Sequence, residues 1–183
     1  MEETFEEIYR GKYLAEPRRV LKLTSNGQVL KGYPYGLNEI AVLKQDSSSM
    51  ITIRAYINNE PLNVYQADGL IIATPTGSTA YSLSVGGPVV APQCACLVLS
   101  PVAPHNLTMR PVVIPSSSDV RLKVHARHAE ISIATDNETC PIPEGAEFRV
   151  RLASRRFFLA VPHNISFYDT LRKKMMWGVD IRS

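Results

Sequence analysis

Six residues between an apolar run and an expected helix bring hydroxyl groups and backbone N–H groups together in this chain. The segment Thr74–Thr79 reads TPTGST, with four hydroxyl side chains, one proline and one glycine. This composition favours an exposed loop over a core element. Hydroxyls and N–H groups at a strand-to-helix turn suit hydrogen bonding to phosphate, ribose or amide groups. A polar small-molecule site is therefore one interpretation, and an ordinary connection with a capping Thr is the other.

Two catalytic loops are excluded at this segment. A Walker loop requires Gly-Lys-Ser or Gly-Lys-Thr, and neither follows here. The Gly-x-Ser-x-Gly elbow of hydrolases requires two glycines around the Ser, which Thr76–Ala80 does not provide.

The residues on both sides of the segment are expected to position it. Leu70–Ala73 is a short apolar run typical of a buried strand. A short helix is predicted over Ala80–Val85, with Ser78 or Thr79 as its N-cap. Gly86–Pro88 should end this helix.

Two further polar groups stand directly before apolar strands. Asn38 and Glu39 precede the run that ends at Leu43, so their side chains can face a pocket at a strand end. A simple boundary between turn and strand is the alternative. Asp68 precedes the strand Leu70–Ala73 and can accept hydrogen bonds from a ribose or an amide, or else cap the turn at Gly69.

These residues carry a resemblance that extends over essentially the whole chain. Asp68-Gly69 followed by TPTGSTAYSLS and Gly86-Gly87-Pro88 resembles the central signature of the NAD kinases, which phosphorylate the adenosine ribose of NAD to make NADP. Other matches occur in the family's order, namely Asn38-Glu39, Pro101–His105, Arg110-Pro111, Leu171–Lys174 and Trp177-Gly178.

The resemblance implies an NAD site in this chain. The residues that match the family's NAD-binding positions are Asn38, Glu39, Asp68, Thr76, Thr79, Ala80, Tyr81 and Ser84. Within this set, Tyr81 offers a ring face for a base, and the two Thr residues offer hydroxyls. The family also implies ATP as a second ligand and a homo-oligomer, a dimer or a tetramer.

The family's Gly-Gly-Asp-Gly loop, whose Asp is taken as the catalytic base, has no counterpart before Asn38. We therefore expect the chain to be the NAD-binding and oligomerising C-terminal part of an NAD kinase. The N-terminal α/β domain, the catalytic base and the Mg²⁺ or other divalent cation would belong to the full-length enzyme. No metal or catalytic residue is expected in this chain, which should be inactive alone.

One departure and two alternatives accompany the resemblance. Asp136-Asn137 stands where the family usually has Asp-Gly, and Asn tolerates positive φ, so the turn can persist. Any contact that needs a bare Gly near the ligand becomes doubtful.

The alternatives are a non-catalytic dinucleotide-binding module and a related lipid kinase, and the run Thr74–Tyr81 argues against the lipid kinase.

Composition excludes several other classes of protein. The chain has 183 residues with 45% hydrophobic content, as expected for a single domain over residues 1–183. Its net charge of +3 is scattered, so nucleic-acid binding is not expected. No apolar run approaches the ~20 residues that span a bilayer, and Met1–Phe5 does not resemble a signal peptide. A cytoplasmic location without membrane association is predicted.

The cysteines are expected to be reduced core residues. Cys94, Cys96 and Cys140 cannot all pair within one chain. A zinc site is not expected, because the histidines show no regular ligand spacing.

The fold class predicted is mainly β, an antiparallel β-sandwich with a short helix at each end. The helices are expected at Thr4–Arg10 and at Phe167–Trp177. The second is basic and also suits a membrane surface, although docking onto protein is preferred. Hairpins are expected at Ser25–Gly27, with a strand from Gln28, and at Asn58–Pro61. Further strands are predicted at Cys96–Leu99, Val112–Ile114, Val120–Val124, Ile131–Ile133, Phe148–Leu152 and Phe157–Val161.

Overall fold

The computed structural model describes residues 2–25, 32–45, 49–126, 130–136, 138–163 and 165–176. The chain divides into two compact units. The sandwich unit is Arg19–Arg156, and the terminal unit joins Met1–Arg18 to Phe157–Ser183. The single domain over residues 1–183 stays a prediction.

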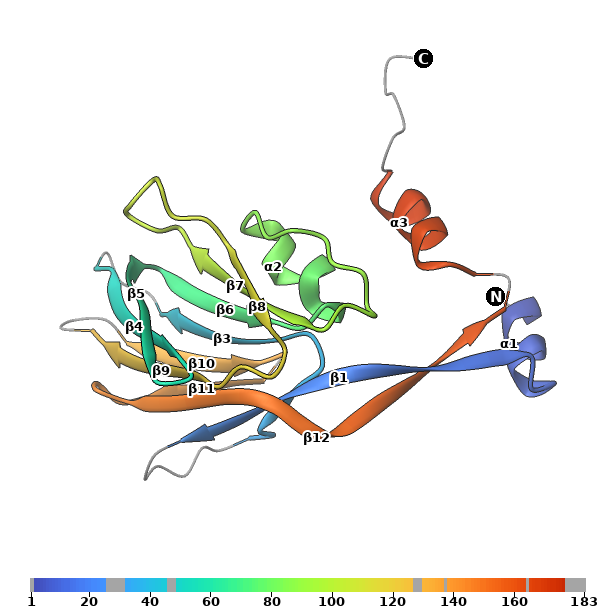
Figure 1. Cartoon of the computed structure of the whole chain (residues 1–183), viewed down its shortest axis with the longest axis horizontal. Coiled ribbons are helices and arrows are strands. Elements are labelled where there is room, and N and C mark those ends of the chain that lie inside the picture. The colour runs from blue at the N-terminus through green and yellow to red at the C-terminus, as the bar shows by residue number, and fades with distance from the viewer. Residues whose placement is uncertain are drawn as a thin grey trace, which may run out of the picture. The chain divides into compact units, whose positions relative to one another are not determined.

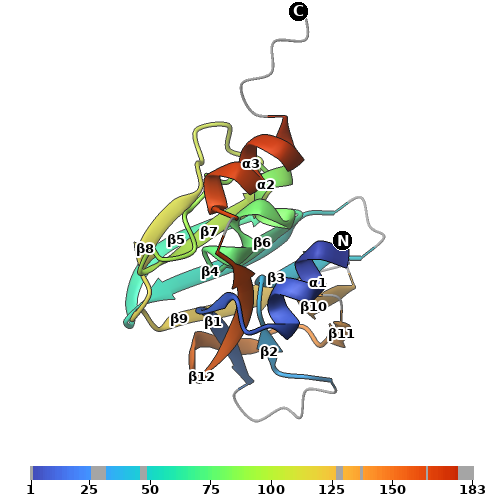
Figure 2. The same ribbon diagram turned by 90° about the vertical axis from the view of Figure 1, so that its right-hand side faces the viewer.

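Two six-stranded sheets make up most of the described chain (Figures 1 and 2). Sheet A has the strand order β2-β1-β12-β9-β4-β5, and sheet B has the order β11-β10-β3-β6-β7-β8. The strands of sheet A are β1 (Tyr13–Ser25), β2 (Tyr35–Gly36), β4 (Ile51–Ile57), β5 (Glu60–Ala67), β9 (Val120–His125) and β12 (Glu147–Pro162). The strands of sheet B are β3 (Glu39–Lys44), β6 (Gly69–Ala73), β7 (Cys96–Val102), β8 (Val112–Pro115), β10 (Ile131–Thr135) and β11 (Glu138–Ile142).

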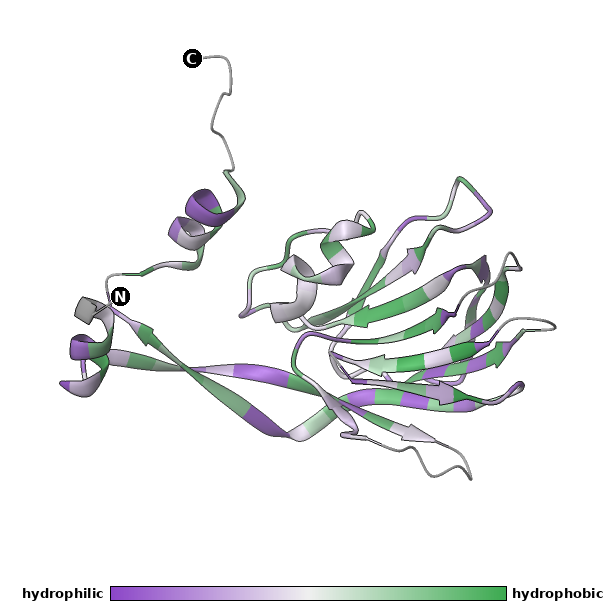
Figure 3. Ribbon diagram, turned by 180° about the vertical axis from the view of Figure 1, so that it is seen from behind, coloured by the Kyte–Doolittle hydropathy of each residue, from purple (hydrophilic) through white to green (hydrophobic). Residues whose placement is uncertain are grey.

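The core of the sandwich unit lies between the two sheets. Strand β9 shows why, because Val120, Leu122 and Val124 are buried while Arg121 and Lys123 between them are only partly buried. This alternation of period two is visible as green and purple bands along several strands (Figure 3). Burying each such apolar side chain stabilises the fold by about 1.5–3 kcal/mol. The antiparallel sandwich predicted from the sequence is confirmed.

Strand β6 is buried along its whole length. On one face Leu70 and Ile72 join the core between the sheets. On the other face Ile71 and Ala73 belong to a second apolar cluster, against which Val85 packs. Val85 follows the helical segments η1 (Thr76–Thr79) and α2 (Tyr81–Ser84), which pack at the end of β6. A strand covered on both faces requires a continuous apolar run, as the sequence has here.

Several local predictions can be compared with the structure. The hairpin at Asn58-Asn59 is confirmed, because both residues have the positive φ of a tight turn, 53° and 71°. The two strands expected at residues 148–152 and 157–161 are one strand, β12. Strand β11 was not predicted, because its sequence ETCPI contains a Pro and lacks apolar alternation.

Two further predictions concern β1 and the cysteines. The partner of β1 is β2, and the expected turn residues Asn26 and Gly27, with Gln28 after them, lie outside the described residues. The prediction that all three cysteines are core residues is wrong, because Cys94 is exposed. All three cysteines are free.

The terminal unit contains the two predicted helices. Helix α1 (Glu2–Tyr9) begins two residues before the expected Thr4. Helix α3 (Phe167–Met175) begins after Ser166, whose hydroxyl accepts a hydrogen bond from the Asp169 N–H at 3.0 Å. Trp177, the expected end of this helix, lies outside the described residues. None of the helices described is long and apolar enough to cross a membrane.

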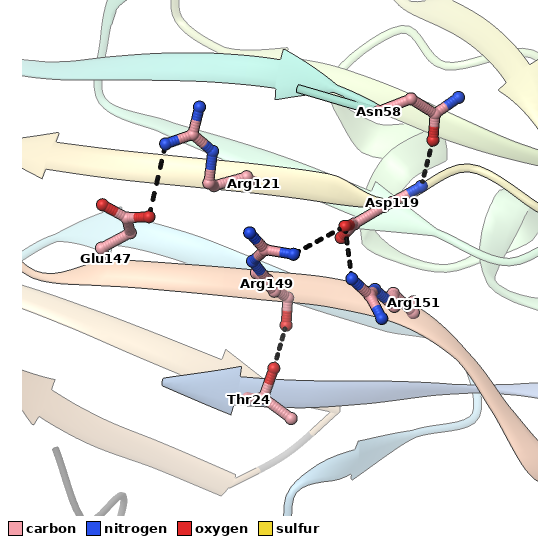
Figure 4. Close-up of polar contacts among 7 residues, drawn as sticks. All are labelled: Thr24, Asn58, Asp119, Arg121, Glu147, Arg149 and Arg151. Carbon is pink, nitrogen blue, oxygen red and sulfur yellow. Dashed lines mark hydrogen bonds and ion pairs between the residues drawn. The ribbon is translucent and has the colours of Figure 1, made fainter. Parts of the chain in front are cut away.

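An ion-pair network crosses the solvent face of sheet A (Figure 4). Asp119, just before β9, exchanges backbone and side-chain hydrogen bonds of 2.9 Å with Asn58 in the β4–β5 turn. Its carboxylate contacts Arg149 at 3.0 Å and Arg151 at 2.5 Å, both on β12. The hydrogen bond from Arg151 and the nearby guanidinium charges lower the pKa of Asp119. The network ties the start of β9 to β12 and to the β4–β5 turn.

Candidate functional site

One end of sheet B gathers polar groups from three adjacent strands. In the order β10-β3-β6, Asp136 follows β10, Asn38 and Glu39 stand at the start of β3, and Thr74 follows β6. Because neighbouring strands here are antiparallel, these positions fall on the same edge of the sheet. The strand register agrees with this placement, because Glu39 at the start of β3 pairs with Ala73 at the end of β6.

Asp136 holds the segment Leu37–Glu39 through four hydrogen bonds. Its carboxylate oxygen Oδ2 accepts the N–H of Leu37 at 2.7 Å. The other oxygen, Oδ1, accepts the N–H of Asn38 at 2.8 Å and that of Glu39 at 3.0 Å. The Asp136 N–H donates back to the Glu39 carbonyl at 3.1 Å. Successive N–H groups that converge in this way form a concave site for an anion, which here is a side chain of the same chain.

Thr74 holds the same segment from the β6 side. Its hydroxyl donates to the Leu37 carbonyl at 2.7 Å, and its N–H donates to the Asn38 carbonyl at 2.8 Å. With the bonds to Asp136, every backbone N–H and C=O of residues 37–39 has a partner. Because the three N–H groups of this segment are engaged, any hydrogen-bond donor that it offers to a ligand must belong to a side chain.

Two side chains of this segment keep free hydrogen-bonding capacity. The amide of Asn38 is partly buried and forms no side-chain hydrogen bond within the described part of the chain. The Oε2 atom of Glu39 is buried and has no hydrogen-bond partner there. A buried oxygen without a partner costs free energy, so Glu39 is available for a donor from outside the chain.

The ionisation of Glu39 is shifted towards neutral pH. Burial raises its pKa from the ordinary value of 4.5 to about 7, and the negative charge of Asp136 acts in the same direction. A hydrogen bond from the Tyr81 backbone N–H opposes this rise. With a pKa near neutral pH, the carboxyl group can donate a hydrogen bond when protonated and accept one when ionised.

The TPTGST segment packs directly on Asn38. A Cβ placed on Gly77 would lie 2.1 Å from the Asn38 carbonyl oxygen, so only a glycine fits this close approach. The Gly77 N–H donates to the Thr74 hydroxyl at 3.1 Å. Ser78 is fully buried, and its hydroxyl donates to the Pro75 carbonyl at 2.7 Å. The prediction of an exposed loop is therefore wrong for most of this segment.

The helix that follows begins differently from the prediction. The N-cap of α2 is Ala80, with no side-chain hydrogen bond, and neither Ser78 nor Thr79 caps it. The Ser78 hydroxyl is occupied, because it also accepts the N–H of Val90 at 2.9 Å. The helix ends at Ser84, one residue before the predicted Val85 and before the glycines that were expected to stop it.

Seven of the eight predicted site residues lie at the start of β3 or on the helical segment that follows β6. Besides Asn38 and Glu39, they are Thr76, Thr79, Ala80, Tyr81 and Ser84 on η1 and α2. Thr79, Tyr81 and Ser84 are exposed, and Tyr81 is 38% exposed. The close approach of Gly77 to Asn38 and the hydrogen bond from the Tyr81 backbone to Glu39 join this helical segment to the start of β3. Their roles in binding stay predictions.

Asp68 lies at the other end of β6. At about 3.3 Å per residue, this strand separates Asp68 from Thr74 by roughly 20 Å. The carboxylate of Asp68 pairs with the Lys44 Nζ at 2.7 Å, and its side chain remains 36% exposed. Within one chain, Asp68 does not meet the other seven residues.

Sequence reasoning did not identify Thr74 and Asp136 as the residues that hold the site. Asp136 was considered only as part of a turn, and it has the positive φ of 51°. Its neighbour Asn137 lies outside the described residues. A signal was present, since an Asp directly after a buried strand often binds nearby backbone N–H groups.

The described residues contain no group of three or more His, Cys, Asp or Glu side chains that could hold a metal ion. Asp136 and Glu39 are two carboxyl groups at the same edge, but the Asp136 oxygens are engaged by backbone N–H groups. This part of the chain does not fit a divalent-cation site.

The shifted pKa of Glu39 gives a testable pH dependence. The pKa of Glu39 is about 7 in the folded chain and has its ordinary value of 4.5 in the unfolded chain. The folded chain therefore binds this proton more tightly. The contribution of Glu39 to the free energy of unfolding is then constant below pH 4.5, falls as the pH rises to about 7, and is constant above. Glu39→Gln, which cannot ionise, should be more stable relative to wild type at pH 8 than at pH 4.5, by roughly 1–2 kcal/mol because solvent screens a partly exposed group.

Urea unfolding at the two pH values measures this difference. Glu147→Gln is the matched control, because the hydrogen bond from Lys123 lowers the pKa of Glu147, so its titration affects stability at and below pH 4.5 and its stability difference from wild type should change little between the two pH values. An equal stability difference between Glu39→Gln and wild type at both pH values would contradict the prediction.

Comparison with known proteins identifies the family to which the chain is similar. Residues 37–162 match the family described as the ATP-NAD kinase C-terminal domain. A protein named NAD kinase from Bacteroides fragilis is 50% identical over 182 residues, 100% of this chain and 63% of that protein. Another from Porphyromonas gingivalis is 42% identical over 175 residues, 94% of this chain and 59% of that protein. The chain thus spans less than two thirds of the length of these relatives.

Two solved structures share the fold. Yeast NADH kinase complexed with NADH matches with a TM-score of 0.85 and 24% identity, over 99% of this chain and 54% of that one. An NAD kinase from Archaeoglobus fulgidus in complex with ATP matches with a TM-score of 0.71 and 23% identity, over 88% of this chain and 60% of that one. The family suggested by the sequence motifs is confirmed. The chain belongs to the family of ATP-NAD kinase C-terminal domains.

Proposed function

We propose that this chain is the dinucleotide-binding part of an NAD kinase, which transfers a phosphoryl group from ATP to the adenosine ribose 2′-hydroxyl of NAD. The observation that carries the proposal is the segment Leu37–Glu39. Its backbone is fully bonded within the chain, while the Asn38 amide and a buried Glu39 oxygen are left for a ligand. The relatives named NAD kinase and the fold shared with an NADH complex and an ATP complex support it.

Each predicted residue has a role that its chemistry allows. Asn38 offers one donor and one acceptor group, which suits a base edge or a ribose hydroxyl. Glu39 can accept from a ribose hydroxyl or, when protonated, donate. The exposed ring of Tyr81 suits stacking on a base, and the small side chain of Ala80 allows a ligand to approach the backbone. Thr76, Thr79 and Ser84 supply hydroxyl groups.

The phosphoryl-transfer step is assigned to the longer protein. This step requires a held triphosphate, a divalent cation and an activated hydroxyl. The described residues offer no cluster of His, Cys, Asp or Glu side chains that could hold this cation. The catalytic base is likewise proposed to lie in the part of the relatives that this chain does not span. A cytoplasmic location also stays a prediction.

Asp68 enters the proposal through a second copy of the chain. It matches an NAD-binding position, yet it lies roughly 20 Å from Thr74 along β6. Its carboxylate remains partly exposed beside Lys44, so it can reach a neighbouring molecule. We infer that Asp68 of one copy completes the site formed by Asn38 and Tyr81 of another, in a homo-oligomer.

The terminal unit supplies surface suited to such association. Large apolar side chains exposed on it include Phe5, Tyr9, Phe157, Phe158, Leu159, Tyr168 and Met176, between 43% and 94% exposed. Exposed apolar groups gathered in one unit mark a surface that contacts another protein surface. The partner is either a second copy or the remaining part of the longer enzyme.

Two alternatives are less well supported. A lipid kinase does not agree with the family match over residues 37–162. A dinucleotide-binding module without catalysis would use the same site and would differ by lacking kinase activity in the longer protein.

NAD binding tests the proposal directly. Calorimetry with the 183-residue chain should detect NAD binding in the millimolar range, and Tyr81→Ala should weaken it about tenfold, or 1.4 kcal/mol, through lost stacking. Val64→Ala is the control, because Val64 is 47% exposed on β5 of sheet A, outside both the proposed site and the terminal unit. No heat with NAD, or equal losses in both variants, would contradict the proposal.

The role of Asp68 is tested by mixing two variants. Asp68→Ala and Asn38→Ala chains should each bind NAD poorly, because each breaks every site. If sites combine residues of two copies, a mixture after subunit exchange should regain wild-type affinity in about one quarter of the sites, as random pairing in dimers gives.

The control mixture combines Asn38→Ala with Tyr81→Ala. Both residues lie on the same edge of one chain, so no mixed pair regains an intact site. Recovery in this control, no recovery in the first mixture, or a monomer by light scattering would each rule out the shared site.

A further inference from the structure

Asp136 is the point on which the arrangement of the proposed site depends. It makes four of the six backbone hydrogen bonds of residues 37–39, and Thr74 makes the other two. We propose that Asp136 is a positioning residue for dinucleotide binding, one that acts by fixing the Asn38 and Glu39 side chains without contacting the ligand. This inference rests on the proposed function.

The geometry specifies a carboxylate at this position. Three N–H groups converge on two oxygens, two on Oδ1 and one on Oδ2. An Asn side chain has a single oxygen, so it can keep the bonds to Asn38 and Glu39 but must then direct its NH₂ group at the Leu37 N–H. Because this NH₂ group and the Leu37 N–H are both donors, the Leu37 N–H is left without an acceptor. Asp136→Asn should therefore release Leu37 first and then loosen the residues after it.

The charge of Asp136 also acts on Glu39. From β10, Asp136 is the ionised group that disfavours ionisation of Glu39. From α2, the Tyr81 N–H favours it, and the residue opposite on β6, Ala73, carries no charge. Removing the Asp136 charge should lower the pKa of Glu39 while burial continues to keep it above 4.5. Asp136 thus sets both the position and the charge state of a side chain proposed to bind the ligand.

The position of residues 37–39 depends on the hydrogen bonds that they make to Asp136. Residues 37 and 38 precede β3, so the strand ladder does not bond their N–H groups. Those groups would otherwise turn to water or to the ligand. A ligand that meets a prearranged segment does not have to order it on binding, which raises affinity.

Three measurements on Asp136→Asn in the full 183-residue chain test the proposal. Amide hydrogen exchange should become at least tenfold faster at Leu37 and less so at Asn38 and Glu39. Carboxyl NMR titration should show a lower pKa for Glu39. Calorimetry should show NAD binding weakened about tenfold. Asp119→Asn is the matched control, since it removes another structural carboxylate, on sheet A, and should change none of the three.

The outcomes separate this inference from the proposed function. Unchanged exchange and titration in Asp136→Asn would overturn the positioning role, and so would faster exchange with unchanged NAD affinity. A wild-type chain that does not bind NAD would overturn the proposed function, while exchange and titration still decide whether Asp136 holds the segment. If Asp136→Asn does not fold, wild type supplies the test. The amide hydrogens of residues 37–39, which donate to the Asp136 carboxylate, should then exchange at least tenfold more slowly than amide hydrogens exposed to water, and unprotected amides would overturn the inference.

Discussion

The complete hydrogen bonding of three consecutive residues governs the functional edge of this protein. Leu37, Asn38 and Glu39 have no free backbone N–H or C=O, because Asp136 and Thr74 take all six groups. A loop before a strand would ordinarily leave some of these groups to water. Here the chain itself satisfies them, so chemistry with a ligand is left to side chains. The same arrangement places the negative charge of Asp136 beside Glu39 and raises the pKa of that carboxyl group.

The sandwich makes this arrangement rigid. Asp136, Asn38 and Thr74 stand at the ends of the adjacent strands β10, β3 and β6, and β6 is buried on both faces. Strands packed on both sides have little freedom to shift, so the three ends keep their spacing. The buried segment that follows Thr74 adds a further constraint, since Gly77 lies against the Asn38 carbonyl without room for a side chain. The scaffold therefore determines where the Asn38 and Glu39 side chains lie.

The sequence predicted the elements better than the contacts between them. The apolar run Leu70–Ala73 and the turn Asn58-Asn59 were clear, because burial and positive φ leave strong local signals. The break expected within β12 does not occur, because pairing in the sheet, not local composition, decides where a strand ends.

Long-range effects account for the remaining errors at the site. The hydroxyl of Ser78 was expected to cap a helix, but it bonds Pro75 and Val90 instead, and Val90 is distant in sequence. The hydrogen bonds from residues 37–39 to Asp136 form because β10 lies beside β3, although the two strands are far apart in the sequence. Local patterns contain none of this information.

A crystal structure of the chain with NAD would show which groups of residues 37–39 bind the ligand. We expect hydrogen bonds from the ligand to the Asn38 amide and the Glu39 carboxyl group, with the six backbone bonds of residues 37–39 to Asp136 and Thr74 unchanged. Ligand atoms bonded to the backbone N–H or C=O groups of these residues, or a ligand bound at a different edge of the sandwich, would contradict this expectation.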